Sequence, residues 1–213
     1  LTNNSTDNDI GNVYRTTAIR FDRDFRFQWT FDISGGVGSG GGADGFSLQW
    51  TTANTANGGS ASGVGLIENP STRNGLKFLT HTNNFLAWYK AGTYQTDANG
   101  SPLWRVKDGY FDQTVYYWLD YDHDNAKAYL FSSLTNTKPA TPAVILNNFS
   151  FDATNYYIGF GAANGTDNAY HALKAMKLSF APVSPIVNEF DYPSFTNPVV
   201  SSLTAVSTEG IDQ

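Results

Sequence analysis

The sequence predicts an all-β fold in which two antiparallel sheets form a sandwich, and three observations lead to this prediction. Apolar residues occupy every odd position from Phe25 to Ile33 with polar residues between them, the period-two pattern of a strand buried on one face. Further short apolar segments recur at regular intervals, and none of them has the 3.6-residue period of a helix. The 213 residues include 15 Phe and 12 Tyr but only three Glu, a composition that favours strands over helices.

The expected strands are short and are separated by polar or glycine-rich turns. The clearest antiparallel pair consists of residues 115–121 and 126–131, with residues 122–125 as the hairpin turn. All the segments together amount to roughly ten strands, enough for a sandwich. The other segments that we expect to form strands are 14–21, 25–33, 45–50, 63–67, 75–80, 85–90, 156–161 and 173–180.

The charge and composition of the chain exclude several classes of function. The formal net charge is −6 and the 13 Lys and Arg residues are spread along the chain, so we expect no nucleic-acid partner. No apolar run reaches the roughly 18 residues that a membrane-spanning helix needs, so we expect no membrane span. Because the chain has no cysteine, it has neither disulfides nor thiolate metal ligands.

The composition changes after residue 180. Residues 181–185 read Ala-Pro-Val-Ser-Pro, and four of the eight prolines lie in the last 33 residues. We expect residues 1–180 to form the sandwich and residues 181–213 to form a tail or a linker to a further domain. The sequence starts at Leu1 without a methionine or a signal peptide, so we also expect it to be a processed piece of a larger multidomain protein.

The order and spacing of several motifs resemble the legume-type (L-type) lectin family, whose fold is a concanavalin A-like jelly-roll sandwich. The resemblance covers about residues 12–180 and implies a domain that binds carbohydrate. Bacterial surface adhesins contain lectin modules of this kind, and the cysteine-free sequence rich in Thr, Asn and Gly fits such a module. The matching motifs are Tyr14-Arg15-Thr16, the alternation from Phe25, Ala43-Asp44-Gly45-Phe46, Gly63-Val64-Gly65-Leu66, Phe78 with Thr80, Leu119-Asp120-Tyr121-Asp122, and the run from Tyr157 to Ala162 followed by His171 and Phe180.

The resemblance implies a carbohydrate-binding site with five candidate residues. Asp44 matches the aspartate that accepts hydrogen bonds from two neighbouring sugar hydroxyls, for which an ionised carboxylate is a strong paired acceptor. Gly63 matches a glycine that donates its backbone N–H to the ligand, and Asn83 keeps the family's asparagine position. Asp167 and Asn168 lie where the family has its variable specificity loop. Each of these residues also has a purely structural interpretation, as a common type of turn or loop residue.

The family's metal-binding signature is not kept in this sequence. The family has Glu-Phe-Asp-Thr where this chain reads Lys77-Phe78-Leu79-Thr80, so Lys77 replaces a glutamate and Leu79 replaces the bridging aspartate. Ca²⁺ takes roughly six to eight oxygen ligands, and a neighbouring ammonium opposes its binding. We therefore expect the standard calcium site to be lost and no cofactor to be needed, while a non-standard calcium site stays open. Our hypothesis is that the Lys77 ammonium takes over the cationic role and holds Asp44 or its loop, and a Lys77 that points into solvent would contradict it.

Two alternatives to sugar binding stay open. The same fold hosts glycoside hydrolases, but a retaining hydrolase needs two carboxyl groups about 5 Å apart, usually from a Glu-x-Asp-x-Glu strand on this fold. That motif is missing, and Glu68, Glu189 and Glu209 lie in a loop and in the tail, so we expect no enzyme. The missing metal signature supports the second alternative, a structural or protein-binding adhesin module that has lost sugar binding.

We therefore expect a lectin domain of a secreted or surface-displayed protein, located outside the cell or on its surface. Its expected partners are glycans or polysaccharide on a cell surface, and its expected role is adhesion. Tyr94, Trp104 and Tyr170 fall in segments that we expect to be loops, where an exposed aromatic ring can stack on a sugar ring.

Overall fold

The computed structural model describes residues 1–3, 9–37, 44–52, 64, 73–80, 85–90, 93–95, 104–105, 113–165 and 167–180. These residues contain 13 strands and no helix. Within this part of the chain there is accordingly no helix that could span a membrane. The all-β prediction is confirmed, whereas the expected tail at 181–213 lies outside the described residues.

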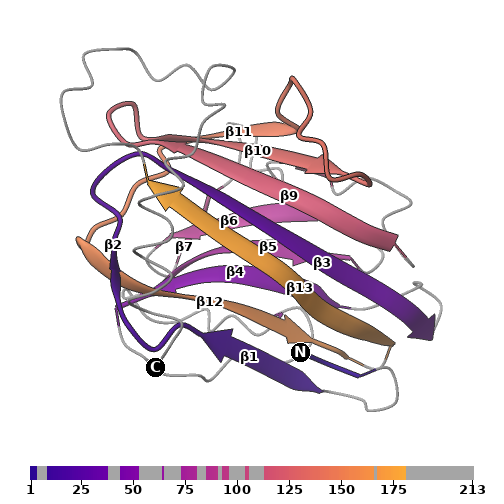
Figure 1. Ribbon diagram of the computed structural model, residues 1–213. Helices are drawn as coiled ribbons and strands as arrows, with labels where there is room; N and C mark the ends of the chain where they lie inside the picture. Colours follow the sequence, from indigo (N-terminus) through magenta and orange to yellow (C-terminus); the bar gives the residue numbers. More distant parts are fainter. Residues whose placement is uncertain are drawn as a thin grey trace.

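The strands form two antiparallel sheets that face each other (Figure 1). The larger sheet has the order β1 (Ile10–Tyr14), β12 (Asn155–Ala163), β4 (Gly45–Thr51), β5 (Arg73–Leu79), β6 (Phe85–Lys90) and β7 (Thr93–Gln95). Two short strands complete it, because β2 (Ile19–Arg20) pairs with β12 and β8 (Trp104–Arg105) pairs with β6. The smaller sheet has the order β11 (Val144–Asn147), β10 (Lys127–Ser133), β9 (Gln113–Asp122), β3 (Phe25–Val37) and β13 (Asn168–Phe180).

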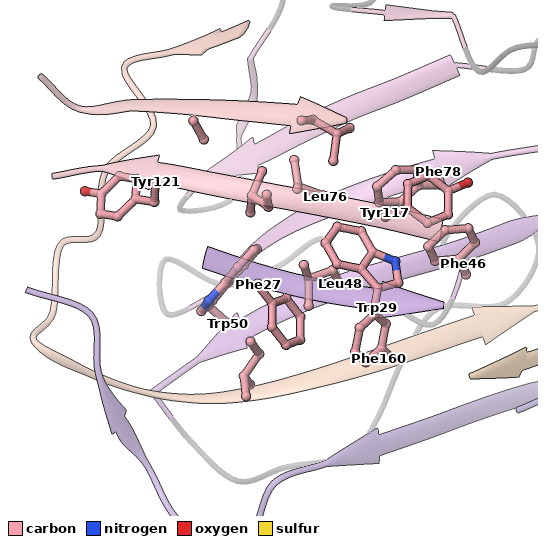
Figure 2. Close-up of a cluster of buried hydrophobic side chains, with 14 of the residues drawn as sticks. Phe27, Trp29, Phe46, Leu48, Trp50, Leu76, Phe78, Tyr117, Tyr121 and Phe160 are labelled. Atoms are coloured by element: carbon pink, nitrogen blue, oxygen red, sulfur yellow. The ribbon is translucent and has the colours of Figure 1, made fainter. Parts of the chain in front are cut away.

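The core between the sheets is built largely of aromatic rings (Figure 2). Phe46 of β4 stacks on Phe31 of β3 with ring centroids 4.0 Å apart and on Phe78 of β5 at 4.4 Å. These contacts join the two sheets through one continuous column of rings, which adds specific ring geometry to the burial of apolar area. The odd-numbered side chains from Phe25 to Ile33 are all buried, as the period-two pattern predicts: Phe25, Phe27, Trp29, Phe31 and Ile33.

The predicted hairpin is also confirmed, with its turn shifted by one residue. Residues 123–126 form the turn between β9 and β10. The carboxylate of Asp122 accepts hydrogen bonds from the backbone N–H of Asn125 at 3.0 Å and from its Nδ2 at 2.8 Å, so this aspartate fixes the turn geometry. Ala126 closes the turn with a φ of 50°.

Several sequence predictions about strands and loops differ from the structure. Residues 14–21 do not form one strand, because β1 ends at Tyr14 and β2 contains only two residues. Val64 lies in a turn with a φ of 46°, while the other residues of the strand expected at 63–67 lie outside the described residues. The segments expected as loops around Tyr94, Trp104 and Tyr170 contain β7, β8 and the start of β13.

Candidate functional site

Asp44 lies directly before β4. In the larger sheet, β4 lies between β12 and β5 (Figure 1). The backbone N–H of Asp44 donates a hydrogen bond to the carbonyl oxygen of Ala163 at 2.8 Å, at the end of β12. Its carbonyl oxygen accepts one from the N–H of Thr80 at 2.9 Å, directly after β5. The residue is half-buried, and its Oδ2 atom is inaccessible to solvent. The peptide groups on both sides of this carboxylate are thus fixed by neighbouring strands.

Position 45 requires glycine, for two structural reasons. Its φ is 135°, a conformation that residues with a side chain rarely adopt. A Cβ atom at this position would also lie only 2.0 Å from the carbonyl oxygen of Phe78. The Asp44-Gly45 pair therefore lies at the start of β4, where the backbones of β4 and β5 approach closely, and it does not form an ordinary hairpin turn.

Two further predicted site residues follow β12: Asp167 lies between β12 and β13, and Asn168 is the first residue of β13. Asn164 is fully buried and organises this connection: its Oδ1 accepts from the N–H of Ala169 at 3.3 Å, and its own N–H donates to the carbonyl oxygen of Asp9 at 2.9 Å. Asp167 and Asn168 are half-buried and follow within five residues of Ala163. Because Ala163 is bonded to Asp44, the structure brings this segment to the same end of the sandwich as Asp44.

Gly63 and Asn83 lie outside the described residues, so their predicted ligand contacts stay predictions. Tyr170 belongs to β13 and leaves 42% of its surface exposed. The ring is therefore accessible, although its placement in a loop was wrong.

Lys77 does not point into solvent. It is fully buried on β5, with Ser47 of β4 and Ala87 of β6 as its neighbours in register. Leu76 and Phe78 face the core, so alternation places Lys77 on the outer face of the larger sheet. Burying an ammonium group costs free energy unless hydrogen bonds or an opposite charge compensate it. Lys77 therefore needs polar partners inside the protein.

The positions that would hold calcium in the family do not supply oxygen ligands here. Lys77 offers a cation and Leu79 a hydrocarbon side chain at the two positions where the family has carboxylates. Among the residues that the structure describes, no group of three or more His, Asp or Glu side chains is arranged to hold a metal ion. The donor set at these two positions therefore does not fit calcium.

A row of polar side chains on the outer face of the larger sheet was not foreseen from the sequence. The hydroxyl group of Tyr14 donates to Oε1 of Gln49. Nε2 of Gln49 donates to Oγ of Ser47 at 2.7 Å, and the Ser47 hydroxyl donates to the carbonyl oxygen of Val64 at 2.8 Å. Ser47 and Gln49 are both fully buried. The sequence did contain a sign of this row, because Ser47 and Gln49 alternate with Phe46, Leu48 and Trp50 along β4. When both faces of a strand are buried, its polar side chains need hydrogen-bond partners.

Neither protein-family models nor curated proteins match the sequence. Solved structures do match, and lectins or lectin-like proteins are among them. The calcium- and Man3GlcNAc-bound exoplasmic/lumenal domain of VIP36 matches with a TM-score of 0.65 at 16% identity, over 87% of this chain and 79% of that one. The chain has the L-type lectin fold. Arcelin-5, a lectin-like defense protein from Phaseolus vulgaris, matches with a TM-score of 0.62 at 15% identity, over 83% and 82% of the two chains. Lectin UEA-II complexed with galactose gives 0.58 at 16% identity, over 84% and 83%.

Proposed function

We propose that this chain is a non-catalytic lectin domain that binds glycans on cell surfaces and acts in adhesion, outside the cell or on its surface. The observation that carries the proposal is the fixed position of Asp44 at the start of β4. Hydrogen bonds to Ala163 and Thr80 hold its backbone, and a Cβ atom at Gly45 would collide with the Phe78 carbonyl oxygen. A residue whose backbone is held in this way presents its carboxylate from a fixed point of the sheet, which supports a role for Asp44 as an acceptor of a sugar hydroxyl.

The surroundings of Asp44 suit hydroxyl recognition. Asp167 and Asn168 supply short polar side chains in the connection that follows Ala163. The exposed ring of Tyr170, two residues further on, offers an apolar face against which a sugar ring can stack. The matched VIP36 and UEA-II structures contain Man3GlcNAc and galactose according to their titles, which supports a glycan as the ligand class for this chain.

We further propose that the site works without calcium. Lys77 is fully buried on β5, two residues from Leu79, which pairs with Gly45. In its protonated form this side chain supplies a positive charge on the strand next to the one that begins after Asp44, in the role that a calcium ion has in the family. The VIP36 structure holds calcium, but in this chain Lys77 and Leu79 stand where the resemblance to the family places the metal-binding carboxylates.

The proposal assigns no catalysis because the aspartates of the predicted hairpin have structural partners. Asp120 is fully buried and bonded to Arg26 and Lys138 on the smaller sheet. Asp122 is engaged by Asn125 in the turn. A general acid must be free to transfer its proton to a substrate, and neither carboxylate has that freedom.

A glycan array probed with the purified chain, with and without EDTA, tests the proposed function. We expect binding to a restricted set of glycans and equal signals in both conditions. Signals that disappear with EDTA and return with Ca²⁺ would contradict the metal-free site while leaving the lectin function intact. No binding to any glycan would contradict the lectin function and favour a structural or protein-binding module.

A further inference from the structure

Residues 1–3 lie between the edge strand β1 of the larger sheet and the edge strand β13 of the smaller sheet (Figure 1). Thr2 forms an antiparallel bridge with His171, near the start of β13. The same residues pass closely over β1, because a Cβ atom at Gly11 would lie only 1.7 Å from the carbonyl oxygen of Leu1. This short segment therefore contacts both sheets at one end of the sandwich.

The hydroxyl group of Thr2 joins the segment to β13. It donates a hydrogen bond to the carbonyl oxygen of Ala169 at 2.9 Å, and its oxygen lies 2.7 Å from Nδ1 of His171. Because the single hydroxyl proton points to Ala169, Nδ1 of His171 carries a proton and donates it to the Thr2 oxygen. Thr2 and His171 are both buried, so removing this hydroxyl group removes two hydrogen bonds from the protein interior.

Asn3 and Asp9 hold the connection between β12 and β13 through Asn164. The side chain of Asn164 is fully buried, and its Nδ2 donates to the carbonyl oxygen of Asn3 at 2.6 Å. Its backbone N–H donates to the carbonyl oxygen of Asp9 at 2.9 Å. Oδ2 of Asp9 accepts from the N–H of Asn3 at 3.0 Å, which ties Asn3 and Asp9 together. We call Thr2, Asn3 and Asp9 the N-terminal clasp.

A single peptide group connects the clasp to Asp44. The N–H of the peptide between Ala163 and Asn164 donates to Asp9, and the carbonyl oxygen of the same peptide accepts from the N–H of Asp44 at 2.8 Å. Because a peptide group is planar, the position of Asp9 constrains the direction of the carbonyl group that holds Asp44. The clasp thus acts on the backbone of the proposed sugar-binding aspartate through one rigid unit.

The clasp also holds the segment that contains two further proposed sugar contacts. Asp167 and Asn168 lie between Asn164 and Ala169. Oδ1 of Asn164 accepts from the N–H of Ala169 at 3.3 Å, so the two ends of this segment are bonded to each other. The clasp binds both ends as well, one through the Asn164 side chain and backbone N–H and the other through the Ala169 carbonyl oxygen.

We propose that the N-terminal clasp positions the glycan site, and this inference rests on the proposed function. The clasp fixes Asp44 and residues 164–169 in the arrangement that receives the sugar, and its three members are positioning residues that need not touch the ligand. It raises affinity because the segment that it holds has less conformational freedom to lose when a glycan binds. By the same coupling, a bound glycan holds the clasp in place.

Thr2→Val tests the proposal, because it removes the hydroxyl group and nearly keeps the shape of the side chain. Thr2→Ser retains the hydroxyl group and serves as the rescue variant. Thr30→Val is the matched control, since Thr30 is also buried, with 8% of its surface exposed against 4% for Thr2, but lies on β3 outside the clasp. Glycan titration measures the affinity of each variant, and hydrogen exchange in peptides covering residues 160–172 measures how firmly the segment is held.

We expect Thr2→Val to bind the strongest glycan from the array about five- to tenfold more weakly, through the loss of two buried hydrogen bonds. Exchange in residues 160–172 should become faster in this variant, and a bound glycan should slow it in the unsubstituted chain. Thr2→Ser should restore both properties, and Thr30→Val should change neither.

Gly11→Ala is a second variant, which leaves every hydrogen-bonding group of the clasp in place. The added Cβ atom would collide with the carbonyl oxygen of Leu1, so residues 1–3 must move away from β1. We expect the same weaker binding and faster exchange as in Thr2→Val. This variant keeps the proposal testable if Thr2→Val folds poorly.

The outcomes separate the clasp from the proposed function. Unchanged exchange in residues 160–172 in both Thr2→Val and Gly11→Ala would overturn the clasp, whatever the chain binds. Faster exchange with unchanged glycan affinity, or an equal loss of affinity in Thr30→Val, would overturn the positioning role and leave the lectin function standing. An unsubstituted chain that binds no glycan would overturn the lectin function and, with it, the role of the clasp in binding.

Discussion

The backbone N–H of Asp44 donates a hydrogen bond to the carbonyl oxygen of Ala163 at 2.8 Å, which joins the start of β4 to the end of β12. The Thr80 N–H, bonded to the Asp44 carbonyl oxygen at 2.9 Å, adds the end of β5 to the same contact. A carboxylate residue held by its backbone on both sides loses little freedom when a ligand binds. This arrangement depends on the absence of a side chain at Gly45.

Gly45→Ala is expected to destabilise the protein by at least about 2 kcal/mol, because a Cβ would collide with the Phe78 carbonyl and Ala disfavours positive φ. Urea denaturation of the variant and the unsubstituted chain measures this difference in the free energy of unfolding. A loss below about 0.5 kcal/mol would mean that the strands do not approach as closely as the structure has them.

Burial makes the stability of the protein sensitive to acid through His171. Its Nδ1 lies 2.7 Å from Oγ1 of Thr2, and because that hydroxyl donates to the Ala169 carbonyl oxygen at 2.9 Å, Nδ1–H is the donor to Thr2. Burial lowers the pKa of His171 from 6.5 to about 3. The unfolded chain takes up a proton near pH 6.5 and the folded chain does not, so the free energy of unfolding falls as pH decreases between these two values.

His171→Gln is expected to remove that part of the acid dependence, which amounts to no more than about 1.4 kcal/mol for each pH unit in this window. Denaturation curves at several pH values between 7 and 4, compared with those of the exposed control His123→Gln, test this expectation. Equal slopes of stability against pH for His171→Gln and the unsubstituted chain would show that His171 is not buried in its neutral form.

The smaller sheet contains a buried ionic cluster. Asp120 is fully buried and accepts two hydrogen bonds from Arg26, at 2.6 Å from Nε and 3.0 Å from Nη2. Lys138 pairs with the same carboxylate, and its Nζ lies 3.9 Å from the centroid of the Phe131 ring. Lys138 belongs to the connection between β10 and β11, so the cluster fastens this connection to the sheet.

Asp120→Asn is expected to destabilise the fold by about 3 kcal/mol, because it leaves two largely buried cations without their shared counter-charge. Asp152→Asn is a suitable control, since Asp152 is 60% exposed in its pair with Lys90 and should have little effect. Thermal unfolding of the two variants side by side measures the contrast. Similar melting temperatures for both variants would contradict the buried cluster.

Much of the fold could be predicted from the sequence because strands with one buried face show an alternation of apolar and polar residues. The alternation that starts at Phe25 identified β3, and the hairpin of β9 and β10 was bounded by its Asp- and Asn-rich turn. The break between β1 and β2 was missed, since residues 14–21 are a plausible strand until the pairing with β12 is known. β11 was missed because its four residues pair only with the edge of β10.

The candidate site could be predicted only where a short sequence motif marks it, and not where it depends on contacts between distant residues. The Asp-Gly pair at 44–45 was singled out through the resemblance to the lectin family, whereas the need for glycine there depends on Phe78, which is far away in sequence. The bond between Ser47 and Val64 could not be foreseen, since it joins two residues that are 17 positions apart in the chain. Lys77 was singled out as a substitution, but its complete burial is a property of the folded sheet.

Titration of Asp44→Asn with the strongest glycan from the array tests the central claim most directly. Asn keeps the shape of the side chain and removes the charge, so we expect folding to be unchanged and affinity to fall by about ten- to a hundredfold, as hydrogen bonds to a charged acceptor are lost. Asp152→Asn, in which the substituted carboxylate is exposed and pairs with Lys90, should bind like the unsubstituted chain. Equal affinity of Asp44→Asn and the unsubstituted chain would contradict the placement of the sugar at Asp44.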